Sequence, residues 1–363
     1  MKPQTSAATE GMIDYDRHSH MQYQHILSRS DVISDLVAKI GRVDPEFVIA
    51  DYGCGPASSA LESVRPAVET YQKLHPGAPL TVRHSDQPGN DWNALSALVF
   101  GPKGYDKGTG PVRTEFAVGS FYDQMAGDNT LSLSTCFTAS HWLRSAVSIH
   151  SPGTLLFADL TGDARQEVAA QADRDWDLFV RNRIAELRPG GYTMISTLGS
   201  TPDPSEINGV RSAACKLYRG LYKVAEGMAQ DGLVQQDALD QFVFPLWFQT
   251  VEEAKRPFAR DPGLLETVEI IEASLHPAAY HPDDLYEDHL SDPETYGALY
   301  SAYVRGFGES SLKLHLFEPS ANSVAEAEDL TETFFARLAA LYRDEPGVYA
   351  FESMIVTLIL RKR

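Results

Sequence analysis

The chain has 363 residues, 43% of them hydrophobic, so it can bury one large core or two smaller ones. Its 50 acidic and 31 basic residues give a net charge of −19 at pH 7, which repels a phosphate backbone and argues against nucleic acid as a partner. No segment has the roughly 18 consecutive apolar residues of a membrane span, so we expect no membrane partner. The three widely spaced cysteines suggest neither disulfides nor a zinc site, so we expect a cytoplasmic protein.

The first half of the chain alternates predicted helices and strands. In order, the segments are a helix over 26–40, a buried strand over 47–51, a glycine turn at 52–56, a helix over 61–74, a strand over 80–84 that ends at Ser85 and Asp86, and an apolar strand at 131–134 before an aromatic segment at 136–143. Strands that alternate with helices predict an α/β fold with a mostly parallel, doubly wound sheet.

The second half changes character. A helix over 183–187 is predicted to end in a tight turn at 188–191, followed by another strand of the sheet at 192–196. Amphipathic helical segments, such as 217–228 and 251–255, then dominate, and late strands are predicted at 311–316 and 353–360 around a helix over 325–342. The predicted division is a cofactor-binding core with an N-terminal lid over 1–202, a helical substrate-binding cap over 203–308 and a return to the core sheet over 309–363.

The residues that follow the strands carry the first chemical signal, because ligands of open α/β sheets bind beyond the carboxyl ends of the strands. Asp51, Gly53 and Gly55 follow the first strand, and the glycines allow a ligand to approach the backbone closely. Asp86 ends the second strand, where a carboxylate can bind both ribose hydroxyls of an adenosine. Two glycines alone also fit a plain turn, and the pattern suits NAD as well as S-adenosylmethionine.

Five motifs in a fixed order carry a family resemblance. They are residues 15–22 (YDRHSHMQ), 49–54 (IADYGC), 86–93 (DQPGNDWN), 118–122 (VGSFY) and 141–143 (HWL). In this order the chain closely resembles the SABATH methyltransferases, which are plant-type carboxyl methyltransferases. The resemblance continues through 179–191, 240–255 and 303–305, so it covers nearly the whole chain.

This resemblance implies a Rossmann-like class I methyltransferase fold with an inserted helical cap, and S-adenosyl-L-methionine as the cofactor. Tyr15 and Ser19 would close over the cofactor, and Asp51 would face its amino-acid part. Asp86 would bind the ribose hydroxyls. The full cofactor-binding set that the resemblance implies is Tyr15, Ser19, Asp51, Gly53, Ser59, Asp86, Gln87, Ser120, Phe121, Cys136 and Phe137. The chain departs from the family at 55–59, where Ser59 stands in the place of an asparagine.

The resemblance also places Gln22 and Trp142 at the acceptor group of the substrate. Both side chains carry N–H donors, which suit a carboxylate, and family members that methylate xanthine nitrogens depart from this pair. A carboxylic acid with a pKa of ~4 is ionised at neutral pH, so direct displacement of the methyl group needs alignment and no base. The expected function is therefore formation of the methyl ester of a small aromatic or apolar carboxylic acid.

The walls of the acid-binding pocket would come from aromatic side chains, which favour a flat or apolar acid. The expected substrate-binding set is Gln22, Thr138, His141, Trp142, Tyr218 and Trp247, with Phe244 and Phe307 as weaker candidates. Thr138 stands where many relatives carry tyrosine, which should enlarge the pocket or change its polarity. The family is often dimeric, so the resemblance also implies a homodimer.

Several other interpretations remain open from the sequence. An NAD-dependent oxidoreductase would use the same sheet, but the chain lacks the third fingerprint glycine after Gly53 and Gly55. An N- or hydroxyl-O-methyltransferase and a non-catalytic ligand sensor are further alternatives. His18, His20 and His25 lack nearby acidic or cysteine partners, so we expect exposed histidines and no metal site. Cys54 is expected to be a small packing residue.

Overall fold

The computed structural model describes residues 20–105, 110–277, 289, 291–352 and 354–363. A seven-stranded sheet forms its centre, in the order β3 (Val112–Val118), β2 (Leu80–Asp86), β1 (Phe47–Tyr52), β4 (Leu131–Phe137), β5 (Leu187–Leu198), β9 (Met354–Lys362) and β8 (Val268–Pro277). The first five strands pair in parallel, and β9 is antiparallel to both of its neighbours. The predicted mostly parallel α/β sheet is confirmed.

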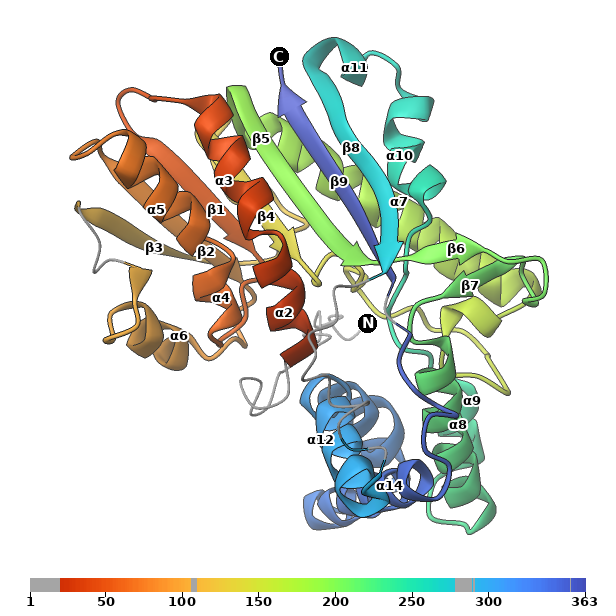
Figure 1. Ribbon diagram of the computed structural model, residues 1–363. Helices are drawn as coiled ribbons and strands as arrows, with labels where there is room; N and C mark the ends of the chain where they lie inside the picture. Colours follow the sequence, from red (N-terminus) through yellow and green to blue (C-terminus); the bar gives the residue numbers. More distant parts are fainter. Residues whose placement is uncertain (1–19, 106–109, 278–288, 290, 353) are drawn as a thin grey trace.

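Helices cover both faces of this sheet (Figure 1). One layer contains α3 (Ser30–Ile40), α5 (Arg65–Leu74) and the shorter α4 (Ser59–Glu62) and α6 (Trp92–Val99); the other contains α7 (Gly162–Glu186), α10 (Val251–Arg260) and α11 (Leu264–Thr267). Alternate residues of β1 pack against the two helix layers. Phe47 and Ile49 pack in the core shared with α3 and α5, whereas Ala50 and Tyr52 pack in the core shared with α7. Burial on both faces explains why this strand is almost continuously apolar.

A helical cap lies beyond the carboxyl ends of the parallel strands, together with the small strands β6 (Ser200–Pro202) and β7 (Val210–Ser212) (Figure 1). Its helices are α8 (Cys215–Gln230), α9 (Gln236–Asp240), α12 (Pro293–Leu312), η3 (Lys313–Phe317), α13 (Glu318–Ser320) and α14 (Val324–Asp344). They share a core of their own, in which the rings of Tyr300 and Tyr342 stack with centroids 4.0 Å apart. Helix α2 (His20–Ser28) lies between the cap and the sheet (Figure 1).

The strand predicted at 311–316 is wrong, because this segment is helical and belongs to the end of α12 and to η3. Its alternating leucines fit a strand as well as a helix. In the structure, Leu312 and Leu316 are buried, while Leu314 between them is 36% exposed. A strand would have placed all three leucines on one face, whereas helical spacing buries only the outer pair.

The tight turn predicted at 188–191 is a bulge inside β5. Leu187 pairs with Leu131 and Tyr192 with Leu133, so β5 carries extra residues between these two pairs. Gly190 has a φ of +79°, and a Cβ on Gly191 would lie 2.8 Å from the Leu131 carbonyl oxygen. The two glycines therefore allow the strand to continue where the sequence predicted a turn.

Further elements differ from the prediction. The single helix expected over 61–74 is divided into α4 and α5, and Pro66 lies in the first turn of α5. Strand β3 was not predicted, because this edge strand is only partly buried and carries Arg113 and Glu115. Strand β8 joins the main sheet although it lies within 203–308, and α14 packs in the cap although it lies within 309–363.

Candidate functional site

A cavity opens at the carboxyl ends of the parallel strands, beside α2. It brings together ten residues that the sequence predicted for the site: Gln22, Asp51, Gly53, Ser59, Asp86, Gln87, Phe121, Phe137, Thr138 and Trp142. The other lining residues are Ile26, Cys54, Gly55, Pro56, Ser63, Gly89, Asn90, Asp91 and Ala139. Side chains that lie far apart in the sequence thus share one cavity.

Asp51 is held rigidly at the end of β1. Its carboxylate accepts hydrogen bonds from Ser63 Oγ at 2.7 Å and from Thr135 Oγ1 at 3.1 Å. The Nδ1 atom of the fully buried His84 lies 3.5 Å from Oδ2. Because three neighbouring elements fix this side chain, its position in the cavity is set before any ligand binds.

Asp86 ends β2 and is held by backbone donors. Its Oδ2 accepts a hydrogen bond from the Gly55 N–H at 2.7 Å, and its Oδ1 accepts one from the Gln87 N–H at 2.7 Å. Burial raises the pKa of Asp86, and these two hydrogen bonds oppose the shift. The carboxylate therefore has a fixed orientation and keeps acceptor capacity for further donors.

The glycine turn between these carboxylates is tightly packed. Gly53 and Gly55 have φ values of +68° and +66°, which side-chain-bearing residues rarely adopt. A Cβ on Gly53 would lie 2.3 Å from the Cβ of Ala139, so the turn after β1 approaches the turn after β4 directly. Only glycine permits this approach of the two turns, both of which line the cavity.

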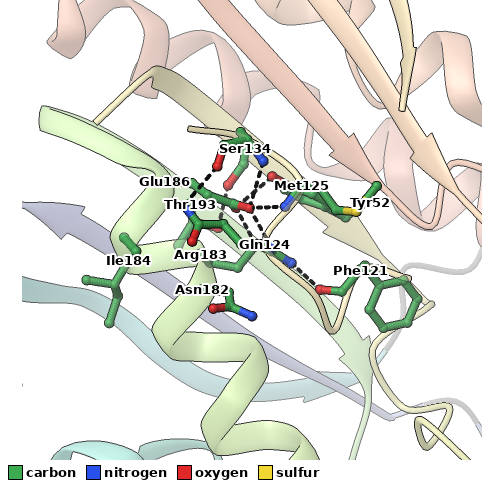
Figure 2. A network of polar contacts seen from close by, with 12 residues as sticks. Tyr52, Phe121, Gln124, Met125, Ser134, Asn182, Arg183, Ile184, Glu186 and Thr193 are labelled. Carbon is green, nitrogen blue, oxygen red and sulfur yellow. Dashed lines mark hydrogen bonds and ion pairs between the residues drawn. The ribbon is translucent and has the colours of Figure 1, made fainter. Parts of the chain in front are cut away.

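Phe121 forms a wall of the cavity from the loop that follows β3. Its ring packs against the Tyr122 and Phe179 rings, with centroids 4.8 and 5.7 Å away. The neighbouring Ser120 is not among the lining residues, and its Oγ accepts a hydrogen bond from the Tyr122 N–H at 3.3 Å. The backbone carbonyl of Phe121 is bound by Arg183 (Figure 2).

The opposite end of the cavity contains Gln22, Thr138 and Trp142. The Oε1 atom of Gln22 is buried and has no hydrogen-bond partner among the residues that the structure describes. Thr138 has a φ of +47°, an unusual conformation for a β-branched residue, and its N–H donates to the Ser196 carbonyl at 2.8 Å. Such strain is common at ligand-binding sites.

Helix α2 is fixed to the sheet by His25. This residue is 1% exposed, so the expectation of an exposed histidine is wrong here; His18 lies outside the described residues. The Nε2 atom of His25 lies 2.8 Å from Ser196 Oγ, and the His25 ring packs edge-on against Phe137. Burial, together with the nearby His276 and Arg29, lowers the pKa of His25 to about 3. A neutral imidazole thus holds the helix that carries Gln22.

Three aromatic side chains predicted for the pocket walls are not among the lining residues. Trp247 packs 4.7 Å from the Phe157 ring, under the Arg165 guanidinium, and Tyr218 packs 5.1 Å from the Phe244 ring. His141 Nδ1 lies 2.9 Å from Thr197 Oγ1, and burial lowers the pKa of His141 to about 3. All three are buried, as is Phe244, and Phe307 packs against the cap core.

The remaining predictions concern Cys136, Cys54 and two residues of the N-terminal segment. Cys136 is buried next to the lining residue Phe137, and burial raises the pKa of its thiol to about 12. Cys54 is a buried packing residue, as predicted, and also lines the cavity. Tyr15 and Ser19 lie outside the described residues.

Sequence reasoning missed Ser63 and Asp91. Ser63 follows Ser59 by one helical turn and faces Asp51, a relation that the helix following the glycine turn could have indicated. Asp91 lies inside the recognised motif 86–93, where it caps α6 by accepting a hydrogen bond from the Ala94 N–H at 2.9 Å.

No group of three or more His, Cys, Asp or Glu side chains in the part of the chain that the structure describes could hold a metal ion. Within the same residues, no helix combines the length and apolar character needed to cross a membrane.

Comparison with known proteins adds the family. Residues 4–363 match the family model described as SAM dependent carboxyl methyltransferase. The chain is 26% identical over 281 residues to jasmonate O-methyltransferase of Arabidopsis thaliana, covering 68% of this chain and 70% of the relative. It is 24% identical over 314 residues to gibberellic acid methyltransferase 2 of the same plant, covering 79% and 78%.

A solved structure supports the fold. Loganic acid methyltransferase, determined with S-adenosylhomocysteine, superimposes with a TM-score of 0.74 at 20% identity, over 98% of each chain. Similarity at this level of identity establishes the architecture of the sheet and cap.

Proposed function

The chain belongs to the family of S-adenosylmethionine-dependent carboxyl methyltransferases, and from this premise we propose that it forms the methyl ester of a small aromatic or apolar carboxylic acid. The observation that carries the proposal is the composition of one cavity. Two fixed carboxylates, Asp51 and Asp86, lie among its lining residues together with two neutral N–H donors, Gln22 and Trp142. The first pair suits the cofactor, and the second pair suits an anionic acceptor.

The residues around the two carboxylates fit S-adenosylmethionine. Asp86 would bind the ribose hydroxyls with its remaining lone pairs, and Asp51 would face the amino-acid part, next to the close backbone approach at Gly53. Phe121 would pack against the adenine, as an aromatic wall with a fixed backbone can. By family resemblance, Tyr15 and Ser19 would cover the cofactor. When bound, the cofactor supplies an electrophilic methyl group on a sulfonium.

The acceptor end supplies orientation. The Gln22 amide and the Trp142 indole would donate hydrogen bonds to the substrate carboxylate and leave one lone pair free to attack. Because a carboxylate is already ionised at neutral pH, these residues need to move no proton. Donors also lower the nucleophilicity of the oxygen that they bind, so the rate gain must come from alignment, which is worth up to about 7–11 kcal/mol in well-oriented systems.

Labelled S-adenosylmethionine and a panel of acids test this function. We expect a labelled methyl ester from at least one benzoate-like, indole-acetate-like, terpenoid or fatty acid, identified by mass spectrometry. Label found on an amine or hydroxyl of an extract, with no ester from any acid, would preserve the cofactor and overturn the role of Gln22 and Trp142. Binding of S-adenosylhomocysteine without any turnover would favour a ligand sensor.

Two further expectations accompany this function. All three cysteines, Cys54, Cys136 and Cys215, are free and buried, which supports a reducing compartment such as the cytoplasm. The homodimer that family resemblance implies can be tested by light scattering after size-exclusion chromatography.

A further inference from the structure

A buried ion pair lies directly behind the Phe121 wall of the cavity. Arg183 and Glu186 occupy the last turn of α7, and both side chains are fully buried (Figure 2). Arg183 Nε donates to Glu186 Oε2 at 2.7 Å, and Nη2 donates to Oε1 at 2.8 Å. Burying two charges is costly unless their other hydrogen-bonding groups are also satisfied. The hydrogen-bond partners of these two side chains therefore show which parts of the molecule the ion pair holds.

The remaining donors of Arg183 hold the loop that carries Phe121. Nη1 donates to the Phe121 carbonyl at 2.5 Å, and Nη2 donates to the Asp123 carbonyl at 3.0 Å. The adjacent Asn182 Nδ2 donates to the Tyr122 carbonyl at 2.8 Å. Three consecutive carbonyls of a loop that forms neither helix nor strand are thus bound by two neighbouring residues of α7.

Glu186 binds the same loop and also Tyr52, whose neighbours Asp51 and Gly53 line the cavity. Its Oε1 accepts hydrogen bonds from the Met125 and Ala126 N–H groups at 2.6 and 3.1 Å. Its Oε2 accepts one from the Tyr52 hydroxyl at 2.7 Å, and the Arg183 guanidinium lies 3.9 Å above the Tyr52 ring. Tyr52 stands between Asp51 and Gly53. One ion pair therefore contacts both segments that flank the cofactor end of the cavity.

We propose that Arg183 and Glu186 are positioning residues for cofactor binding, which hold the Phe121 loop and the turn after β1 in the arrangement that receives the adenosine. This inference rests on the proposed cofactor site. The loop has no regular secondary structure, so these side-chain bonds contribute directly to fixing its shape. A loop that is fixed before binding loses less conformational entropy when the ligand arrives. The loop also touches the acceptor end, where the Tyr122 hydroxyl donates to the Trp142 carbonyl, so loosening the loop should weaken cofactor binding strongly and acid binding less.

The test is isothermal titration of the full chain with S-adenosylhomocysteine, using Arg183→Lys. Lysine keeps the charge opposite Glu186 but lacks the fork that reaches the two carbonyls. We expect the Kd to rise at least about tenfold. At saturating S-adenosylmethionine, kcat and the KM for the acid should remain within about threefold, a split that general unfolding would not produce.

A matched control is Arg305→Lys, which alters an arginine paired with Glu309 and Glu332 in the cap. Its Kd for S-adenosylhomocysteine should match that of the wild type. If Arg183→Lys does not fold, Asn182→Ala removes only the bond to the Tyr122 carbonyl, and its Kd should rise about threefold.

The outcomes separate this inference from the proposed function. If the wild type binds S-adenosylhomocysteine and a folded Arg183→Lys or Asn182→Ala variant binds it equally tightly, only the positioning role is overturned. A wild-type chain that binds no S-adenosylhomocysteine would overturn the proposed function as well. Tight binding by the wild type and weak binding by the variants, with the Arg305→Lys control unchanged, supports the positioning role and the proposed cofactor site.

Discussion

The two ends of the cavity are built differently. At the end proposed to bind the cofactor, Asp51 and Asp86 each accept at least two hydrogen bonds from the surrounding backbone or side chains. At the proposed acceptor end, the Gln22 carbonyl oxygen is buried without a partner among the described residues, and Thr138 keeps a strained backbone. Hydrogen bonds within the chain therefore fix the proposed cofactor end before a ligand binds, whereas fewer such bonds fix the proposed acceptor end.

This difference follows from the elements that supply each end. The cofactor end uses residues immediately after adjacent parallel strands, and the sheet fixes their spacing. The acceptor end uses α2 and the turn after β4, which meet through the contact of His25 with Ser196 and Phe137. A fixed cofactor end and a more adaptable acceptor end would let one fold accept different acids with one cofactor.

Removing the donors of the acceptor end should have the largest effect. For Gln22→Ala and Trp142→Ala we expect kcat/KM for the acid to fall about 100-fold, because the carboxylate loses its alignment. The Kd for S-adenosylhomocysteine should stay within about threefold, since Asp51 and Asp86 are unaffected. Trp142→Phe keeps a ring but removes the N–H, so it separates hydrogen bonding from bulk. If both alanine variants lost cofactor affinity and kept the KM for the acid, the two ends would be assigned the wrong way round.

A change at the cofactor end should have the converse effect. Asp86→Asn removes the charge that would strengthen hydrogen bonds from the ribose hydroxyls, so we expect the Kd for S-adenosylhomocysteine to rise about tenfold. The KM for the acid, measured at saturating cofactor, should not change. Asp91→Asn is the matched control, because Asp91 also lines the cavity and asparagine is an equally good helix cap. Equal weakening by both substitutions would mean that net charge, and not Asp86 itself, binds the cofactor.

Local sequence pattern brings the residues of the proposed cofactor end together without help from the family resemblance, and the reason is physical. Asp51, Gly53 and Asp86 follow strands directly, so local pattern and the rule for open sheets bring them together. Gln22 and Trp142 could be paired only through family resemblance, because no local pattern relates a helix to a turn so far along the chain. Nothing in the sequence around His25 indicates that its partner is Ser196, 171 residues later.

The aromatic residues show the limit of the resemblance. Aromatic residues such as Tyr218 and Trp247 occur both in pocket walls and in helical cores, so residue type does not distinguish these two locations. Their packing against Phe244 and Phe157 is decided by how α8 and the preceding cap segments meet. Arg183 is similar, since its role depends on the conformation of a loop about 60 residues earlier.

The attachment of α2 should make stability depend on pH. The pKa of His25 is about 3 in the folded chain against 6.5 in the unfolded chain, so between these values the unfolded state binds more protons. The free energy of unfolding should therefore decrease as the pH falls below 6.5, by about 1.4 kcal/mol per pH unit from this residue. His25→Gln can still bond Ser196 but does not titrate, and urea unfolding at pH 6.5, 5.5 and 4.5 should show the shallower dependence.

His141 has the same shifted pKa and should retain its own share of this dependence in the His25→Gln variant. Arg29 and His276, which face His25, also remain in place. A pH dependence that His25→Gln leaves unchanged would show that the pKa of His25 is not lowered in the folded chain, and hence that water reaches the ring and α2 is not firmly fixed to the sheet. The acceptor end would then be looser than its contacts indicate, which would sharpen the contrast with the cofactor end.

The smallest effect is expected from Trp247→Phe, and it tests whether the cap remains where the structure has it. Trp247 is buried against Phe157 and Arg165 and is not among the lining residues, so the KM for the acid should change less than about twofold. The free energy of unfolding should fall by about 1–2 kcal/mol, because the cation–π contact and part of the packing are lost. A tenfold change in KM with little loss of stability would mean that the cap closes until Trp247 touches the acid. The acceptor end would then be completed by movement, whereas the cofactor end is completed by hydrogen bonds already in place.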